Sequence, residues 1–471
     1  MPLAVNEQSA EIAELAREWA LVDALMGGTP AMREAGELYL PRWPNELPAA
    51  YETRLSTATL FPAFRRTVGV MAGKPFAKEL TLSDETPPQI RTWSEDIDLQ
   101  GVSLHTFAAE MFEQVVAWGM AGILVEYPDA AMRDEDGNII ERTLTRAQML
   151  ASGHRPYFVR IGPHQILGWR SEQVGGRTRL TQLRLLETVD EPDGGFGTVY
   201  AHQVRVLYPG GWEIYRQPAE GAEWQVVRSG RTALSEIPFV PLYGDRKAFM
   251  QGLPPLIDLA YQNVEHWQSK SDQQTILHTA RVPILAVSGV DDEDFELVIG
   301  ASAAVRLPMG ADLKYVEHTG AAIEKGAAAL EALQASMVQT GAELLVSREG
   351  QRTATESAND AEANKSQLLR MAEGFEDALD QALQFMADYV GLPSGGNVSL
   401  FKDYGATSLS DASAQLVQTL QGAGVISKRT AINEFKRRGV LAQEVDADDE
   451  AELVASSSDG LGLDLSDGDG T

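Results

Sequence analysis

The feature that most constrains the fold is a pair of long helical segments separated by a short insert. Residues 254–280 have apolar positions at helical spacing, and Pro254 and Pro255 suit a first helical turn. A strand pattern and a compact α/β segment follow over 281–320, and helical spacing returns over 321–346. At ~1.5 Å per residue, the second helix would span roughly 39 Å. The fold must therefore accommodate two long helices joined by an inserted subdomain.

The connection after the second helix is unusually charged. Most helix–helix connections are a few small polar residues. The stretch LLVSREGQRTATESAND (344–360) instead gathers charged and amide side chains around one glycine, namely Arg348, Glu349, Gly350, Gln351 and Arg352. One interpretation is that Arg348 and Arg352 pair with Glu349 or with a neighbouring subunit. The alternative is that this connection has a function of its own.

A capping box ends this connection. The Thr353 hydroxyl is spaced to cap a new helix while the Glu356 carboxylate reaches back to the start of that helix. Apolar residues then continue in helical register to Val390. The sequence therefore predicts a helix from 354 to about 390, followed by a short strand within 398–404.

The N-terminal half predicts a mixed α/β domain. Helical spacing over 7–27 ends at the GGTP stretch, and a second helical region over 49–71 is expected to kink or split at Pro62. Residues 98–130 read as a helix capped by Ser103 and a buried strand. Between about 155 and 245 the hydrophobic period changes to two, with glycine-rich turns, which predicts an antiparallel sheet.

The C-terminal part predicts two more helices and an acidic tail. The helices are expected over 408–424 and 427–441. Residues 444–471 contain ten acidic residues with serine and glycine, a composition that favours disorder.

Composition excludes several classes of protein. The net charge of −29, from 39 Lys and Arg against 68 Asp and Glu, argues against a protein that wraps nucleic acid, because affinity for phosphates comes largely from Lys and Arg. There is no cysteine, hence no disulfide or thiolate metal site. The acidic, amphipathic N-terminus does not resemble a signal peptide, and no apolar run approaches a membrane span. We expect a soluble intracellular protein.

Catalytic motifs are missing from the sequence. It contains no P-loop, no HExxH and no GxSxG pattern. The densest acidic run is DDEDFE (291–296), but adjacent residues in a strand or turn point apart, so a divalent-metal site is disfavoured against an acidic docking surface. We expect no enzyme activity, no cofactor and no bound metal.

Four segments in order carry a resemblance to a known family. They are 39–76, 105–130, 155–170 and 306–357, which begin YLPRWPNELP, HTFAAEMFEQ, RPYFVRIGPH and RLPMGADLKY. Together they resemble the portal proteins, or head-to-tail connectors, of tailed double-stranded DNA phages. The likeness is to a branch long labelled only as a domain of unknown function, and it covers roughly residues 35–450.

The resemblance implies a mixed α/β, multi-domain, helix-rich architecture that assembles into a ring. The implied parts are a wing over 1–253, a first stem helix over 254–280, a clip over 281–320, a second stem helix over 321–346, a tunnel loop over 347–353, a long wing helix over 354–395, a crown over 396–443 and the acidic disordered tail over 444–471.

The resemblance also implies partners. It predicts a dodecameric ring at one capsid vertex of the virion, assembled in the host bacterial cytoplasm, through which double-stranded DNA passes without sequence-specific contacts. Terminase large subunit, major capsid and scaffolding proteins, and a head-completion or tail adaptor protein would dock on the ring. No membrane partner is expected. An acidic channel would repel phosphate and leave DNA no resting position.

Three groups of residues follow as site predictions. The stem helices would line the channel with Glu265, Gln268, Asp272, Glu324 and Glu331. The clip would dock partners through Asp291, Asp292, Glu293, Asp294 and Glu296. The tunnel loop would form a basic or polar collar from Arg348, Glu349, Gly350, Gln351 and Arg352.

Two alternatives remain open. One is another structural virion protein, such as an adaptor or a capsid component. The other is a metal-dependent hydrolase or nuclease that uses the acidic clusters, in which Asp291, Asp292 and Asp294 would be essential.

Overall fold

The protein was analysed as a computed structural model, which divides into a first unit, Met1–Leu400, and a second unit, Phe401–Thr471. It describes residues 3–128, 131–133, 139–141, 153–219, 221–232, 234–280, 284–288, 310, 312–316, 320–343, 366–402, 404, 427 and 429–430. The mixed α/β, helix-rich class predicted from the sequence is confirmed.

The first helix, α1 (Ala10–Ala35), begins at the N-cap Ser9, whose hydroxyl accepts a hydrogen bond from the Ile12 N–H. The predicted end of the first helical segment at the GGTP stretch is confirmed, because Gly28 has a non-helical backbone there, but the helical segment that follows to Ala35 was not predicted. The chain bends at Gly28, where φ is 75°, and helix then resumes, with Pro30 in the first turn after the bend, where a missing N–H costs little. The short η1 (Gly36–Leu38) follows.

The predicted split at Pro62 is confirmed. Helix α2 (Pro48–Thr57) ends before it, and α3 (Ala63–Gly73) starts directly after it. No side chain of the neighbouring sequence accepts a hydrogen bond from the first N–H groups of α3. The short helix α4 (Pro88–Trp93) lies further along the chain.

Helix α5 (Leu104–Trp118) and strand β2 (Met120–Glu126) are joined by one residue, Gly119. The Ser103 cap predicted for α5 is confirmed. Gly119 has φ of 78°, and a Cβ there would lie 2.0 Å from the backbone carbon of Leu253. Only glycine allows this close approach, which brings the strand before the long helix pair onto the α5–β2 junction.

The predicted antiparallel region is confirmed as two sheets. A three-stranded sheet has the order β11-β2-β5, and a five-stranded sheet has the order β10-β9-β8-β7-β6. The new strands are β5 (Tyr157–Ile161), β6 (Ile166–Val174), β7 (Arg177–Asp193), β8 (Gly197–Tyr208), β9 (Gly211–Arg216), β10 (Gln225–Arg231) and β11 (Phe239–Tyr243). Every pairing in them is antiparallel.

Smaller two-stranded sheets complete this region. They pair β12 (Asp245–Ala248) with β13 (Gln251–Leu253), β3 (Ala131–Arg133) with β4 (Ile139–Glu141), and β1 (Thr81–Leu82) with β16 (Val398–Ser399). The last pairing joins segments that lie more than 300 residues apart in the sequence. Strand β16 falls within the strand predicted over 398–404.

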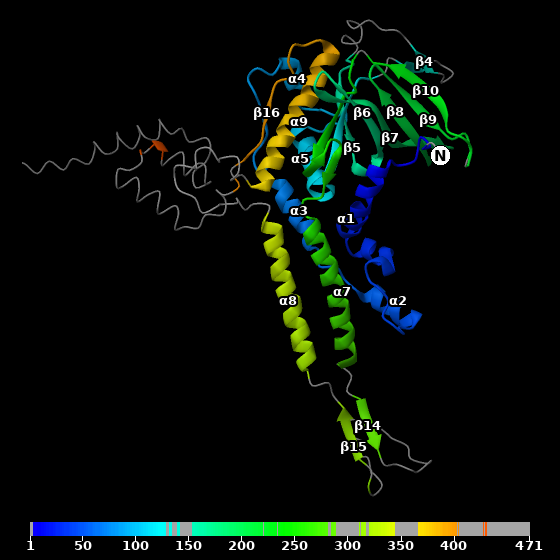
Figure 1. Cartoon of the computed structure of the whole chain (residues 1–471), viewed down its shortest axis with the longest axis vertical. Helices are drawn as coiled ribbons and strands as arrows, with labels where there is room; N and C mark the ends of the chain where they lie inside the picture. Colours follow the sequence, from blue (N-terminus) through cyan, green and yellow to red (C-terminus); the bar gives the residue numbers. More distant parts are fainter. Residues whose placement is uncertain are drawn as a thin grey trace, which may run out of the picture. The chain divides into compact units, whose positions relative to one another are not determined.

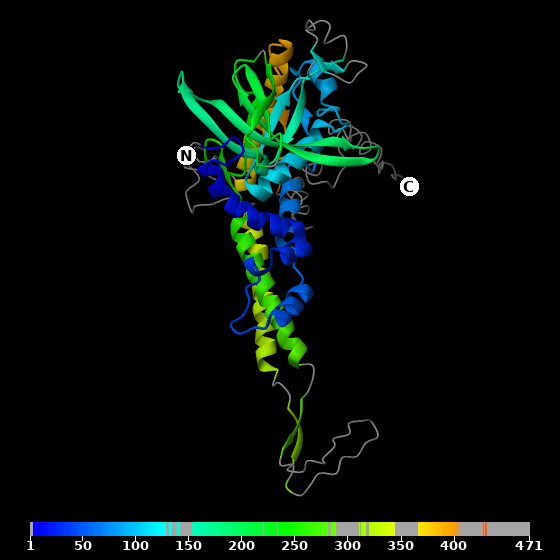
Figure 2. The ribbon, with the colours of Figure 1, turned by 90° about the vertical axis from the view of Figure 1, so that its right-hand side faces the viewer.

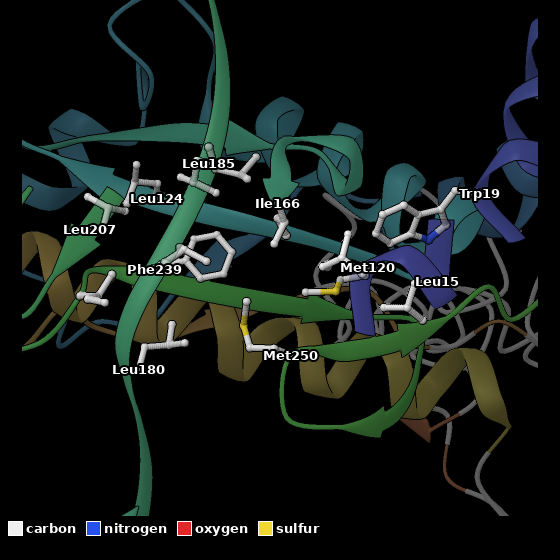
Figure 3. Packing of buried hydrophobic residues seen from close by; sticks show 14 residues of the cluster. Leu15, Trp19, Met120, Leu124, Ile166, Leu180, Leu185, Leu207, Phe239 and Met250 are labelled. Carbon is white, nitrogen blue, oxygen red and sulfur yellow. The ribbon is translucent and has the colours of Figure 1, made fainter. Parts of the chain in front are cut away.

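The main core lies where the two sheets and α1 meet, and Figure 3 shows its side chains converging from these elements. Leu15 and Trp19 enter it from α1, and Met120, Leu185 and Phe239 enter it from the strands. The Trp19 indole N–H also donates to the Trp118 carbonyl oxygen at 3.0 Å, so this large buried ring leaves no polar atom without a partner.

Helix α9 (Gln367–Val390) packs against β2 and β11 through a continuous apolar face. The prediction that this helix starts at 354 was wrong. Ser366 is extended, with ψ of 154°, and its hydroxyl accepts a hydrogen bond from the Leu369 N–H, so the helix begins at Gln367. The first large apolar residue after 353 is Leu368, so only from there can an amphipathic face bury itself.

In the second unit, the Ser427 hydroxyl accepts a hydrogen bond from the Thr430 N–H at 3.1 Å. The helices predicted over 408–424 and 427–441, and the tail over 444–471, otherwise lie outside the described residues. None of the described helices is both long enough and apolar enough to span a membrane.

Candidate functional site

The candidate site is an antiparallel pair of helices with a strand pair between them in sequence. Helix α7 (Ile257–Ala280) lies beside α8 (Ala321–Ala342), as Figure 1 shows in green and yellow. Strands β14 (Ile284–Ser288) and β15 (Asp312–Val316) pair in antiparallel register from Ile284–Val316 to Ser288–Asp312. The succession predicted from the sequence, a helix, an insert with a strand and a second helix, is therefore present.

The interface between α7 and α8 is unusually polar. The Gln273 amide donates to the Ile323 carbonyl oxygen at 2.8 Å, and Gln262 lies 3.5 Å from the Ser336 hydroxyl. Near the Gln262–Ser336 contact, Gly341 of α8 approaches Thr67 and Leu259 so closely that a Cβ would lie 2.9 Å from Thr67. Directional hydrogen bonds and a small residue at close approach fix the register of the two helices more tightly than apolar contacts would.

His266 is the most buried titratable side chain of this interface, with only 1% of its surface exposed. Its Nε2 lies 3.0 Å from the Gln334 amide nitrogen, and its ring centroid lies 5.2 Å from that of Phe61. Burial lowers the pKa of His266, and the positive charge of Lys270 lowers it further. The imidazole is therefore neutral at pH 7, and Nε2 accepts the hydrogen bond.

Asn263 joins α7 to the N-terminal helices. Its side-chain oxygen accepts a hydrogen bond from the Phe64 N–H, and its amide nitrogen donates to the Phe61 carbonyl oxygen, both at 2.9 Å. Asn263 is fully buried. It therefore supplies from a distant part of the chain the cap that α3 lacks locally.

Residues 39–60, which we call the strap, lie along α7 (Figure 2 shows this segment in blue beside the green helix). The Gln268 amide donates to the Tyr39 carbonyl oxygen at 3.0 Å, and the Lys270 ammonium donates to the Thr59 carbonyl oxygen at 3.1 Å. Contacts from both ends of the strap to one stretch of α7 hold this part of the helix in place.

A buried ion pair braces the strap. Arg54 forms two 2.8 Å hydrogen bonds with the Glu46 carboxylate, and 3% and 4% of these side chains are exposed. The Arg54 guanidinium also lies 4.3 Å from the Trp43 ring. The hydrogen bonds from Arg54 lower the pKa of Glu46 despite the burial of that carboxyl. Asp272 of α7 lies nearby, and burial raises its pKa.

The predicted channel-lining residues do not share one surface. Gln268 and Asp272 interact with the strap, whereas Glu265, Glu324 and Glu331 are exposed. At about 100° per residue, Glu265 points to the side of the helix pair where Gln262 meets Ser336. Glu324 and Glu331 point to the opposite side, where Thr67 meets Gly341. One wall cannot contain all of them.

Other predicted site residues lie outside the described part of the chain. These are the clip acids Asp291, Asp292, Glu293, Asp294 and Glu296, the connection residues Arg348, Glu349, Gly350, Gln351 and Arg352, and the capping pair Thr353 and Glu356. Their roles stay predictions. Within the described residues, no three His, Asp or Glu side chains gather as they would around a metal ion.

Sequence reasoning missed a charged cluster between the two large sheets. Arg205 of β8 forms ion pairs with Glu126 of β2 and, at 2.7 Å, with Glu187 of β7. Burial lowers the pKa of Arg205 to about 10 and raises that of Glu187. Arg205 and Glu126 of this cluster line a cavity of about 520 Å³. The sequence signal for this cluster is a set of charged residues within predicted strands. Strands with one exposed face show the same pattern, so the signal does not distinguish a buried cluster.

Comparison with known proteins gives one family match and several distant structural similarities. Residues 255–390, which run from α7 to the end of α9, match the family model described as "Domain of unknown function (DUF4055)". No curated protein matches the chain significantly.

Three solved structures are distantly similar. The neck of a native gene transfer agent (GTA) particle computed with C12 symmetry is 14% identical, with a TM-score of 0.39 over 81% of this chain and 89% of that chain. The neck of an empty GTA particle computed with C6 symmetry is 15% identical, with a TM-score of 0.39 over 80% and 90%. The virion of a native GTA particle is 13% identical, with a TM-score of 0.39 over 79% and 89%.

Proposed function

We propose that this chain is a phage portal protein, which forms a ring at one capsid vertex and provides the channel for DNA packaging and ejection. One observation carries the proposal. The chain leaves a mixed α/β region through α7, passes through the β14–β15 pair, returns along α8 and continues into α9, which packs on the sheet. A stem of two helices with a clip between them requires this order of elements.

In this proposal α7 and α8 form the stem, and β14 and β15 belong to the clip. The polar α7–α8 interface suits a stem that keeps its register under load, because a sliding helix pair would break several hydrogen bonds together. The clip acids Asp291, Asp292, Glu293, Asp294 and Glu296 would dock the terminase large subunit and later a head-completion or adaptor protein. Terminase supplies the ATPase, in agreement with the absence of a P-loop from this sequence.

The side of the stem that carries Glu265 is the better candidate for the channel wall. Its exposed residues on α7 include Asp258, Glu265 and Ser269 and no Lys or Arg. On α8 it carries the exposed Lys325, eleven residues before Ser336, so these residues together remain acidic and would on balance repel DNA phosphates. The opposite side carries Glu324 and Glu331 and would face away from the DNA. Arg348 and Arg352, in the connection between α8 and α9, would form a collar that touches phosphates briefly and resists back-slippage.

Negative-stain images of the purified full chain, combined with native mass spectrometry, test the proposal. A closed ring of identical subunits with a central hole of about duplex width, ~20 Å across, supports a portal. A monomer, an open filament or an isologous dimer at micromolar concentration contradicts it. Deletion of residues 451–471 should leave the ring intact, because the tail is expected to take no part in assembly.

The tunnel-loop collar has its own test. Arg348→Ala together with Arg352→Ala should leave ring assembly unchanged and lower the amount of DNA packaged or retained. Unchanged packaging would return these arginines to a purely structural role.

A further inference from the structure

The five-stranded sheet extends into an exposed arm. Residues Asp190–Tyr200 form the end of the β7–β8 hairpin, and we call them the tip. Phe196 is fully exposed there, and Val199 and Tyr200 are 50% and 65% exposed. The tip also carries Asp190, Glu191 and Asp193 and no basic residue. An exposed aromatic group with acidic neighbours, held on a regular hairpin, is a typical interaction element.

A groove of complementary character lies at the other end of the same strand. It has a volume of about 850 Å³, and its walls include the start of β7, strands β11 and β12, and α9. Buried apolar side chains form its floor, including Leu180, Met371 and Phe385. Four arginines line it, Arg177, Arg179, Arg246 and Arg370, against the three carboxylates of Glu236, Asp245 and Asp377.

A glycine in the groove wall points to an occupant. Gly374 lies in the middle of α9, where glycine costs about 1 kcal/mol relative to alanine. Among the residues that the structure describes, no atom would lie within 4 Å of a Cβ at this position. The packing of the described residues therefore does not require a glycine, whereas a second chain that enters the groove close to the α9 backbone would.

The geometry of β7 decides which chain can enter. The groove includes Arg177–Leu180 at the start of this strand, and the tip begins near its last residue, Asp193. From Leu180 to Asp193 a strand spans about 40 Å. Figure 2 shows ribbons of this sheet projecting to opposite sides. A tip cannot reach its own groove while β7 stays paired, so the matching groove belongs to another copy.

We propose that the tip of one subunit, with Phe196 at its centre, docks in the groove of the next subunit. Because the two surfaces differ and lie at opposite ends of one strand, the contact is heterologous and repeats from subunit to subunit. Phe196 would sit on the apolar floor beside Gly374, and Asp190 and Asp193 would face Arg177 and Arg370. This inference deepens the proposed ring and rests on it for closure, but the contact itself requires only two copies.

The cysteine-free sequence gives a direct test. Thr198→Cys places a thiol in the tip and Gln381→Cys places one on α9 in the groove, and each residue is exposed. Mixing these two single variants with a bismaleimide should give one cross-linked heterodimer, and a chain with both changes should give a ladder of multiples. Cross-linking of the Thr198→Cys variant only with itself would overturn the proposal, because it would indicate a tip-to-tip contact.

Further variants test the chemistry of the contact. Phe196→Ala, Gly374→Trp and Arg370→Glu should each lower the cross-linking yield about tenfold, as loss of an interface anchor does. Gly69→Trp is the matched control, because Gly69 lies within α3, outside the groove, and a Cβ there would also meet no atom of the described part of the chain within 4 Å. Asp193→Arg should partly restore the yield of Arg370→Glu, and unchanged yields in all these variants would overturn the proposal.

The same samples separate this inference from the proposed function. Rings without a Thr198–Gln381 cross-link would leave the portal proposal standing and remove tip docking. A cross-link without rings would support tip docking and contradict the portal proposal.

Discussion

Asn263 caps α3 across 199 residues of sequence: its side-chain oxygen accepts a hydrogen bond from the backbone N–H of Phe64 at 2.9 Å. The same side chain donates to the carbonyl oxygen of Phe61. One buried amide therefore fixes the start of α3 relative to α7. Since α8 also contacts α3 and α7, the orientation of the helix pair depends on this contact.

We expect Asn263→Leu to lower the free energy of unfolding by about 2–4 kcal/mol, because it leaves a buried N–H and a buried carbonyl oxygen without partners. Urea unfolding followed by circular dichroism measures the change. Ser269→Ala is the control, since Ser269 is exposed on the same helix. An equal loss in both variants would show that α7 is sensitive to any substitution.

The neutral state of His266 predicts a dependence of stability on pH. Burial lowers the pKa of His266 in the folded protein, so the unfolded chain binds a proton first as pH falls. The contribution of the neutral imidazole to the free energy of unfolding is therefore complete above the unfolded pKa, near 6.5, and is lost as pH falls below that value. Melting temperatures between pH 7.5 and 5.5 should fall less steeply in His266→Gln than in the wild type. Ser269→Ala, at an exposed position of α7, should keep the wild-type slope.

The Arg54–Glu46 pair predicts strongly non-additive substitutions. Arg54→Met or Glu46→Gln alone should cost about 3–5 kcal/mol, because each leaves a buried charge without its partner. The double variant should cost less than the sum, and a double-mutant cycle measures the coupling. Additive losses would mean that the two side chains act independently. Arg42→Met combined with Glu37→Gln should show little coupling, because this ion pair at the start of the strap is exposed.

The two sides of the helix pair predict different effects of charge reversal. If the proposed function holds, Glu265→Lys should slow DNA packaging because it puts attractive charges in the channel, whereas Glu331→Lys should not. Ring assembly checked by native mass spectrometry separates this effect from misassembly. The reverse result would assign the channel wall to the side that carries Glu324 and Glu331.

We expect Gly119→Ala to lower the stability of the fold through its effect on the backbone. Gly119→Ala puts a methyl group 2.0 Å from the Leu253 backbone at a residue with φ of 78°, so the α5–β2 junction and β13 must separate. We expect at least about 3 kcal/mol of destabilisation, since overpacking and a left-handed backbone act together. Gly153→Ala shares the positive φ, and no atom of the described residues lies within 4 Å of a Cβ there, so it should cost about 1 kcal/mol.

Local patterns in the sequence predicted most elements of the fold. Three signals that act within a few residues predicted elements that the structure contains. They are the N-cap Ser103, the helix break at Pro62 and the period of two over 155–245. The start of α9 was misplaced because the Thr353–Glu356 spacing is also local, whereas the apolar face that stabilises the helix begins only at Leu368.

The residues that organise the candidate site were harder to find. Asn263, His266 and Gln334 are polar residues in helical segments, and such residues are usually exposed. Their partners come from other helices, so no spacing rule connects them. The side to which Glu265 and Glu331 point depends in turn on how α7 and α8 pair.

The separation between Phe64 and Asn263 also sets an order of events during synthesis. At about 5–20 residues per second, the ribosome needs roughly 10–40 seconds to reach Asn263 after it has made Phe64. During this interval both large sheets can form, while the first turn of α3 has no cap. The first turn of α3 therefore gains its cap only after α7 emerges, and a nascent chain stalled before residue 263 should expose α3 to proteases and chaperones.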